Sequence, residues 1–207
     1  VINRIFLEHT RELGDTLTAI AEDKSHIITG EQKCVYFAKQ EPEVLEVLLR
    51  RAGDLQVPCK IYGRDFHAEN IRYTCLGMQF DVVIGDNIYP DLQIPLLGEH
   101  QAKNCALALA VCMDVMAELC RESEAPDIFS DTMCNQIRRQ LSAIHHPGRM
   151  ELLRSDPFVL LDACINSASC ENVKEVLRHL GIQNCTVIVG IPEDKDYAGV
   201  VRSMRDM

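Results

Sequence analysis

Two residues near the start of this sequence, His9 and Lys24, could together bind a metal ion and a phosphate. His9 follows the apolar run Ile5-Phe6-Leu7, which predicts the end of a buried β-strand. Lys24 lies fifteen residues later and closes a segment with apolar residues at helical spacing, so a helix would bring it back over the strand end. The pair indicates a ligand site because ligands bind at the carboxyl ends of strands in α/β proteins. The alternative is a structural histidine and a solvated lysine.

The segments that must position these residues alternate between strand and helix. Residues 34–38 and 59–63 are short apolar runs that predict strands. Residues 42–53 between them predict a helix, with a proline at its start and a glycine after its last apolar residue. This alternation is typical of a parallel sheet covered by helices. Residues 70–97 differ, since short apolar stretches separated by turn residues predict an antiparallel addition to the sheet.

The second half of the chain continues the α/β pattern after a break. Residues 103–120 predict an Ala-rich helix that is buried on most sides, and residues 128–144 predict another helix. His145-His146-Pro147-Gly148 then interrupts the pattern, and we place a domain boundary there, between residues 1–146 and 147–207. Beyond it, the sequence predicts a β-α-β unit and a last helix, at residues 158–162, 170–180, 185–190 and 197–206.

The composition excludes several classes of protein. With 47% apolar residues, the chain can bury a large core. Its formal charge of -10 disfavours nucleic acid as a partner, because a phosphate backbone requires a basic surface. No apolar run is long enough to span a membrane, and no signal peptide opens the sequence. The ten cysteines lack Cys-x-x-Cys spacing, which favours reduced thiols in the cytoplasm over a zinc site or a disulfide framework.

Four sequence blocks extend the first motif into a specific pattern. The first block runs from Ile5 to Lys24 and contains Leu7-Glu8-His9-Thr10. The other three are Leu97-Gly98-Glu99-His100-Gln101-Ala102-Lys103-Asn104, Pro147-Gly148-Arg149-Met150-Glu151 and Gly190-Ile191-Pro192-Glu193-Asp194-Lys195-Asp196. In kind and in order, these blocks resemble the folylpolyglutamate synthase/dihydrofolate synthase branch of the Mur ligase family. The resemblance spans essentially the whole chain.

The resemblance implies a two-part α/β architecture. Residues 1–146 would be the C-terminal part of a P-loop-like central domain that binds ATP, and residues 147–207 the first half of a Rossmann-like C-terminal ligase domain. The phosphate-binding motif Gly-x-x-x-x-Gly-Lys-[Ser/Thr] of such a domain is absent from the sequence. The first residues already lie inside a motif, and no initiator methionine precedes them. We therefore interpret the chain as a fragment of a longer protein, inactive alone.

The activity that the resemblance implies is ATP-dependent amide ligation. Such an enzyme adds L-glutamate to a folate or dihydropteroate through an acyl phosphate, with ATP and Mg²⁺ as cofactors, and we expect a monomer. His9 matches the family's magnesium ligand, and Lys24 matches the lysine that is carbamylated there and has a catalytic role. A carbamate offers the hard anionic oxygens that Mg²⁺ prefers, whereas an ammonium group repels the ion.

The resemblance also implies a nucleotide site, in the cleft between the two domains. Gln101 and Asn104 match positions that contact adenine, where an amide suits a purine edge because it both donates and accepts. The alternative is that both residues cap the following helix. Arg149, placed at the domain junction, would bind phosphate and act in catalysis. Asp162 ends a predicted strand, where the family holds the ribose hydroxyls.

The sequence departs from the family at one important position. After Asp162 the family has Asp-Gly-Ala-His-Asn-Pro, but here isoleucine, Ile165, replaces the histidine. Since Ile165 can neither donate a hydrogen bond nor carry charge, the role of that histidine is lost. Two alternatives stay open: a divergent Mur-type ligase with another acceptor, and a nucleotide-binding paralogue without catalysis. Lys195 and Asp196 match the last block, and we assign them no role.

Overall fold

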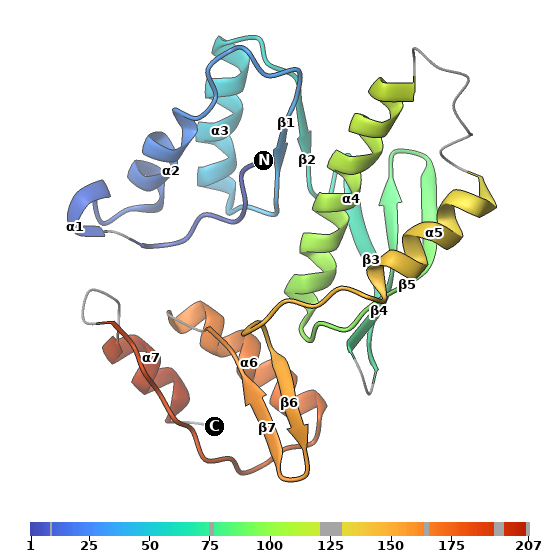
Figure 1. The fold of residues 1–207 in the computed structure, drawn as a ribbon. Helices are drawn as coiled ribbons and strands as arrows, with labels where there is room; N and C mark the ends of the chain where they lie inside the picture. Colours follow the sequence, from blue (N-terminus) through green and yellow to red (C-terminus); the bar gives the residue numbers. More distant parts are fainter. Residues whose placement is uncertain (9, 75–76, 121–129, 164–165, 193–196, 206–207) are drawn as a thin grey trace. The chain divides into compact units, whose positions relative to one another are not determined.

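The structure is a computed structural model of residues 1–207, of which it describes residues 1–8, 10–74, 77–120, 130–163, 166–192 and 197–205 (Figure 1). The elements in chain order are α1 (Thr10–Leu13), α2 (Leu17–Ser25), β1 (Val35–Phe37), α3 (Pro42–Asp54), β2 (Cys59–Ile61), β3 (Phe66–Thr74), β4 (Gly77–Ile84), β5 (Asn87–Ile94), α4 (Glu99–Cys120), α5 (Asp131–Leu141), β6 (Glu151–Ser155), β7 (Phe158–Leu161), α6 (Ser167–His179) and α7 (Tyr197–Met204). None of these described helices meets the length and hydropathy required to span a membrane.

The chain divides by its contacts into two compact units. Unit 1 comprises Val1–Ala68, Val82–Ile88 and Lys103–Ile128. Unit 2 comprises Glu69–Asp81, Tyr89–Ala102 and Phe129–Met207. The strands β3, β4 and β5, which form a three-stranded sheet in that order, and helix α4 supply residues to both units.

Unit 1 contains the parallel pair β1–β2, with Val35 opposite Cys59 and Phe37 opposite Ile61. Helices α2 and α3 lie side by side and pack on this pair (Figure 1). Their apolar faces enter one core cluster, in which Ile20, Phe37 and Leu48 are fully buried. The alternation of strand and helix predicted for residues 17–63 is confirmed.

Local sequence signals explain where these two helices begin. The Thr16 hydroxyl accepts a hydrogen bond from the Ala19 amide at 3.2 Å, which satisfies an amide at the start of α2 that has no partner within the helix. Pro42 occupies the first turn of α3, where its missing N–H costs nothing. Helix α3 thus begins where the sequence predicts, and the Thr16 cap accounts for the start of α2.

The strand expected at Ile5-Phe6-Leu7 is displaced toward the N-terminus. Ile2 forms the isolated parallel bridge to Phe37, while residues 3–8 belong to no strand. The Ile2 amide donates to the Tyr36 carbonyl at 2.8 Å, and the Ile2 carbonyl accepts from the Ala38 amide at 3.0 Å. Ile5 is still buried, but Leu7 is exposed, so the chain leaves the sheet before reaching the motif.

Residues 66–94 form the added sheet that the sequence predicts. Gly85 and Asp86 make a two-residue connection between β4 and β5, which joins antiparallel strands. Gly77 begins β4 where the backbone is crowded: a Cβ placed there would lie 2.0 Å from the Ile94 carbonyl oxygen. Only glycine fits that approach.

Helix α4 begins at Glu99, four residues before the predicted start, and its burial is uneven. Ala102, Ala106 and Ala110 are fully buried, whereas Val115 and Leu119 are exposed. The prediction of a helix buried on most sides is therefore correct only for its first half. In unit 1, the Asp114 carboxylate accepts from the Tyr36 hydroxyl and pairs with Lys60 at 2.6 Å, which attaches α4 to β1 and β2.

The C-terminal part of unit 2 contains an antiparallel pair, β6–β7, and helices α6 and α7. Strand β7 and helix α6 were predicted, but β6 was not. The strand predicted at residues 185–190 is wrong, since no strand is assigned among the described residues 181–192. A strand requires a neighbour for its backbone hydrogen bonds, and β6 and β7 pair with each other. Ile188, in the middle of the predicted strand, is 95% exposed.

Candidate functional site

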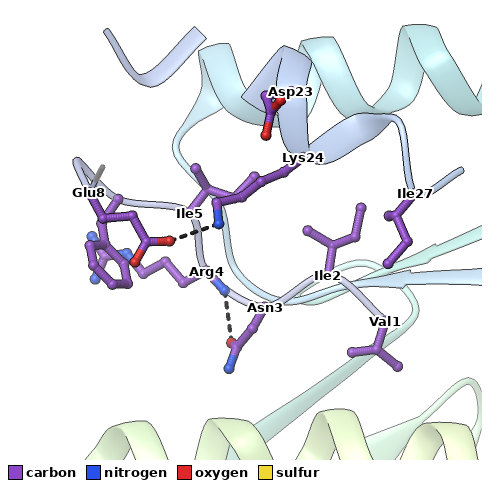
Figure 2. Close-up of a pocket in the computed structure, with 10 residues that line it drawn as sticks. Val1, Ile2, Asn3, Arg4, Ile5, Glu8, Asp23, Lys24 and Ile27 are labelled. Atoms are coloured by element: carbon purple, nitrogen blue, oxygen red, sulfur yellow. Dashed lines mark hydrogen bonds and ion pairs between the residues drawn. The ribbon is translucent and has the colours of Figure 1, made fainter. Parts of the chain in front are cut away.

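The Lys24 side chain lies beside an open cavity of about 550 Å³ in unit 1, lined by Val1, Ile2, Asn3, Arg4, Ile5, Phe6, Glu8, Asp23, Lys24 and Ile27. Its amino nitrogen lies 2.8 Å from the Glu8 carboxylate, and Figure 2 shows the two side chains pointing toward each other. Both are largely shielded, with 34% and 29% of their side-chain surface exposed. The last turn of α2 thus brings Lys24 back over the N-terminal motif, as its spacing predicts.

The donor groups of this cavity fit a magnesium ion only in part. The Glu8 carboxylate is a hard oxygen ligand of the type that Mg²⁺ prefers. The Lys24 ammonium group opposes a cation, and the described residues contain no group of three or more His, Cys, Asp or Glu side chains that could hold a metal ion. His9 lies outside the described residues. Conversion of Lys24 to a carbamate would replace the repelling charge with anionic oxygens.

A second candidate site lies in unit 2, where a turn packs against the end of strand β7. The Ala163 amide donates to the Gly148 carbonyl at 2.8 Å, and the Met150 amide donates to the Asp162 carboxylate at 2.9 Å. Arg149 lies between Gly148 and Met150, the turn residues that make these two contacts, and its side chain is exposed. The structure thus brings together two residues, Arg149 and Asp162, that the sequence placed in one nucleotide site.

The electrostatics of Asp162 reflect its burial. Burial raises the pKa of the Asp162 carboxyl above its ordinary value of 3.8, while the Met150 amide and the Arg149 charge act to lower it. A partly buried carboxylate costs free energy unless it is compensated. A perturbed carboxylate next to an arginine is typical of ligand-binding sites, although structural pairs can produce the same shift.

The turn that carries Arg149 is held by Glu151. The Glu151 carboxylate accepts from the Gly148 amide at 2.7 Å and contacts the His145 ring at 3.0 Å. The Gly148 hydrogen bond, and then His145, lower the pKa of Glu151. Gly148 and Met150 both adopt positive φ, 70° and 48°, so the backbone reverses sharply on both sides of Arg149. This conformation directs the Met150 amide at Asp162.

The candidate adenine residues lie on the first two turns of α4. Gln101 is half-buried, and its backbone N–H donates to the Gly98 carbonyl at 2.9 Å. Asn104 lies one turn later and is exposed. Residues three apart share a helix face. Because α4 begins at Glu99, Asn104 lies beyond the turn that needs capping, so the capping alternative does not apply to it.

One core cluster of unit 2 connects these segments. Leu97, Met150 and Val176 are buried together in it. Leu97 lies four residues before Gln101, and Met150 follows Arg149 and bonds to Asp162. Packing therefore joins the start of α4 to the turn at the end of β7. The Asn166 side chain accepts from the Ser169 amide at 2.8 Å and caps α6, which gives this residue a structural role.

Several predicted residues cannot be placed. His9, Ile165, Lys195 and Asp196 lie outside the described residues. Conversely, sequence reasoning did not assign a role to Glu8, the partner of Lys24, although an acidic residue next to His9 was the available signal. It also did not find the Met150 amide as the partner of Asp162. Every residue except proline has a backbone N–H, so the residue type does not indicate such a contact.

Residues 1–112 match the Mur ligase middle domain. The chain is 30% identical over 200 residues to the folylpolyglutamate synthase of Lacticaseibacillus casei, in an alignment that covers 97% of this chain and 44% of that enzyme. It is 28% identical over 212 residues to a dihydrofolate synthase/folylpolyglutamate synthase of Mycobacterium tuberculosis, covering 99% of this chain and 42% of that protein. The chain thus spans less than half the length of these relatives.

The fold agrees with a solved structure of the same kind. A crystal structure of Mycobacterium tuberculosis folylpolyglutamate synthase complexed with ADP and AMPPCP superposes with a TM-score of 0.80 at 27% identity, covering 98% of this chain and 44% of that chain. The expected α/β architecture is confirmed.

Proposed function

The chain belongs to the Mur ligase family, and from this premise we propose that it is part of an ATP-dependent carbon–nitrogen ligase that adds L-glutamate to a folate or dihydropteroate. In this reaction the substrate carboxylate attacks the γ-phosphorus of ATP and gives an acyl phosphate and ADP. The glutamate amine then displaces phosphate, and an amide remains. The relatives named folylpolyglutamate synthase and dihydrofolate synthase, and the ATP analogue AMPPCP in a solved relative, support this substrate set.

The observation that carries the proposal is the arrangement at the end of β7. A half-buried carboxylate, Asp162, is held by a backbone amide in a turn that also presents the exposed Arg149. We assign Asp162 to the ribose hydroxyls, as a charged acceptor of their hydrogen bonds, and Arg149 to phosphate oxygens and to catalysis. We assign Gln101 and Asn104 to the adenine edge.

We assign the cavity beside Lys24 to the magnesium-dependent half of the site. His9 and a carbamylated Lys24 would hold Mg²⁺, which neutralises phosphate charge when it is bound. A Lys24 carbamate would lie close to the Glu8 carboxylate, and the two negative charges would repel each other unless a cation compensated them. We therefore expect carbamate and Mg²⁺ to depend on each other, and unmodified Lys24 when the 207 residues are isolated.

We also propose the organisation of the protein. Residues 1–146 form part of the ATP-binding domain and residues 147–207 part of the C-terminal ligase domain. The protein acts as a cytoplasmic monomer on small molecules, without nucleic acid or a membrane as partner. The net charge of -10 and the free cysteines among the described residues support this setting. The 207 residues alone are expected to be inactive, because the phosphate-binding motif is not in this sequence.

The test is phosphate release by the full-length protein. The protein is supplied with ATP, Mg²⁺, L-glutamate and, in turn, folates, dihydropteroate and unrelated carboxylates. Release that requires a folate or dihydropteroate supports the proposal. Release only with another carboxylate selects a divergent Mur-type ligase, and ATP binding without any release selects a paralogue that lacks catalysis, as the isoleucine at Ile165 would explain.

A further inference from the structure

Tyr73, near the end of strand β3, contacts two parts of unit 2 that are distant in sequence. Its ring stacks on the imidazole of His179 at the end of α6, with ring centres 4.0 Å apart and planes inclined by 16°. Tyr73 also packs against the core cluster of Leu97, Met150 and Val176. A large aromatic ring in such a position restricts the movement of every segment that it touches.

The core cluster against which Tyr73 packs includes neighbours of the candidate nucleotide residues. Leu97 lies two residues before the start of α4, where Gln101 lies. Met150 follows Arg149 and donates its amide to Asp162 at 2.9 Å. Through this cluster, the Tyr73 ring links the start of α4 to the end of β7.

The phenol oxygen of Tyr73 lies in the same buried environment. It is fully buried, and it forms no hydrogen bond with the described residues. Burial, with the negative charges of Glu175 and Glu99, raises the pKa of Tyr73 to about 12, so the phenol stays neutral. The first residue of α4, Glu99, thus acts electrostatically on this phenol.

His179 supplies a rigid surface for the stack. Its Nδ1 lies 3.0 Å from the Glu175 carbonyl oxygen of the same helix. A carbonyl oxygen only accepts, so Nδ1 carries the proton and the ring is oriented by α6 itself. Tyr73 therefore packs on the His179 ring, which is held in place by its contact with Glu175 in α6.

We propose that Tyr73 is a positioning residue for recognition of the nucleotide base, because it sets the orientation of Gln101 relative to Arg149 and Asp162. This inference rests on the proposed ATP site. An amide distinguishes adenine from guanine only if its donor and acceptor are correctly directed, because the two bases present opposite groups at position 6. Loss of the ring would let the first turn of α4 rotate, and the preference for adenine over guanine would decrease.

The experiment compares Tyr73→Leu and Tyr73→Phe in the full-length protein. Affinities for AMPPCP and for its guanine counterpart are measured by calorimetry, and unfolding temperatures are recorded in parallel. We expect Tyr73→Leu to reduce the adenine-to-guanine preference about tenfold, the lower range for one bidentate base contact. Tyr73→Phe keeps the stack and should lose less of the preference. Tyr62→Leu removes a different aromatic pair, Tyr62–Phe66 in unit 1, and should leave the preference unchanged.

A folded Tyr73→Leu protein with the wild-type preference overturns the inference. If Tyr73→Leu does not fold, His179→Leu and Tyr73→Phe decide: a reduced preference in either supports the inference, and an unchanged preference in both overturns it. Wild-type protein that binds neither nucleotide contradicts the proposed function itself. That result differs from one in which the wild-type protein binds nucleotide and the Tyr73 variants keep the same adenine-to-guanine preference.

Discussion

At the scale of single residues, Lys24 is the side chain whose chemical state matters most. Its amino group lies 2.8 Å from the Glu8 carboxylate, and the two form an ion pair. Carbamylation would replace the positive charge of Lys24 with a negative one and break this pair, so the Glu8 contact opposes the modification. A bound divalent cation would reverse the balance, because it attracts both the carbamate and the Glu8 carboxylate.

We expect Lys24→Ala to reduce phosphate release by the full-length enzyme about a hundredfold or more, since a metal ion that stabilises a phosphoryl group is worth several kcal/mol. Removal of carbon dioxide and bicarbonate should lower the activity of the unsubstituted enzyme, and restoring bicarbonate should recover it. The mass of the peptide that contains Lys24 should increase by one carboxylate only when Mg²⁺ and nucleotide are present. Lys39→Ala, at an exposed lysine of the same unit, is the control. Full activity in Lys24→Ala would rule out the assigned role.

Asp162 is expected to bind ligand at the expense of stability. Burial raises the pKa of its carboxyl above 3.8, so the folded protein holds this proton more tightly than the unfolded chain does. The contribution of this group to stability is therefore complete below its unfolded pKa and is lost as the pH rises through its folded pKa. The surroundings of Asp162 therefore disfavour its ionised form in the folded protein.

Asp162→Asn should therefore leave the free energy of unfolding at pH 7 equal or higher, since the amide oxygen can still accept from Met150. It should nevertheless weaken AMPPCP binding about tenfold, because a charged hydrogen bond to the ribose is lost. Urea unfolding between pH 4 and pH 7 and calorimetry measure the two effects. Asp54→Asn, at an exposed carboxylate, should change neither. Lower stability together with unchanged nucleotide affinity would mean that Asp162 is only structural.

At the scale of elements, the central strand of the added sheet, β4, begins at a crowded glycine. A Cβ at Gly77 would lie 2.0 Å from the Ile94 carbonyl oxygen, and Gly77 has a φ of +154°. Gly85, at the β4–β5 turn, also has positive φ, +57°, but nothing lies within 4 Å of its Cβ position. An alanine at Gly85 would therefore meet backbone strain alone, whereas an alanine at Gly77 would meet both backbone strain and steric overlap.

We expect Gly77→Ala to destabilise the full-length protein by about 3 kcal/mol or more, the sum of strain and overpacking. Gly85→Ala should cost about 1 kcal/mol, since only the left-handed backbone is disfavoured. Thermal unfolding measures both, and each kcal/mol corresponds to roughly 2–4 °C in a domain of this size. Equal effects for the two substitutions would show that the Gly77 contact is relieved by a backbone shift.

Sequence alone predicts the elements whose signals are local. The starts of α2 and α3 follow from Thr16 and Pro42, and the apolar spacing of their residues gives the buried faces. The strand expected at 185–190 was wrong because an apolar run cannot specify its own partner. Likewise, the Lys24 position was predictable from spacing, but the amide that holds Asp162 was not, since it depends on the positive φ of Met150.

At the scale of the whole molecule, the redox state and exposure of the cysteines bear on the compartment in which the protein resides. Eight of the ten cysteines lie in the described residues as free thiols. Their surroundings differ widely: Cys112 and Cys185 are exposed, whereas Cys170 is buried and contacts the Val200 carbonyl. Burial raises the pKa of Cys105 to about 12, so almost no thiolate forms there at neutral pH.

These differences predict an order of thiol reactivity. Because the thiolate is the nucleophile, a thiol reagent at pH 8 should label Cys112 and Cys185 first, and Cys105 and Cys170 only on unfolding. Peptide mass spectrometry after timed labelling of the full-length protein measures the order. In denaturant without reductant, all ten cysteines of this chain should be labelled if the protein resides in a reducing compartment. Any pair that stays unlabelled would indicate a disulfide and would contradict the cytoplasmic location. Rapid labelling of Cys105 in the folded protein would contradict the burial of this α4 residue.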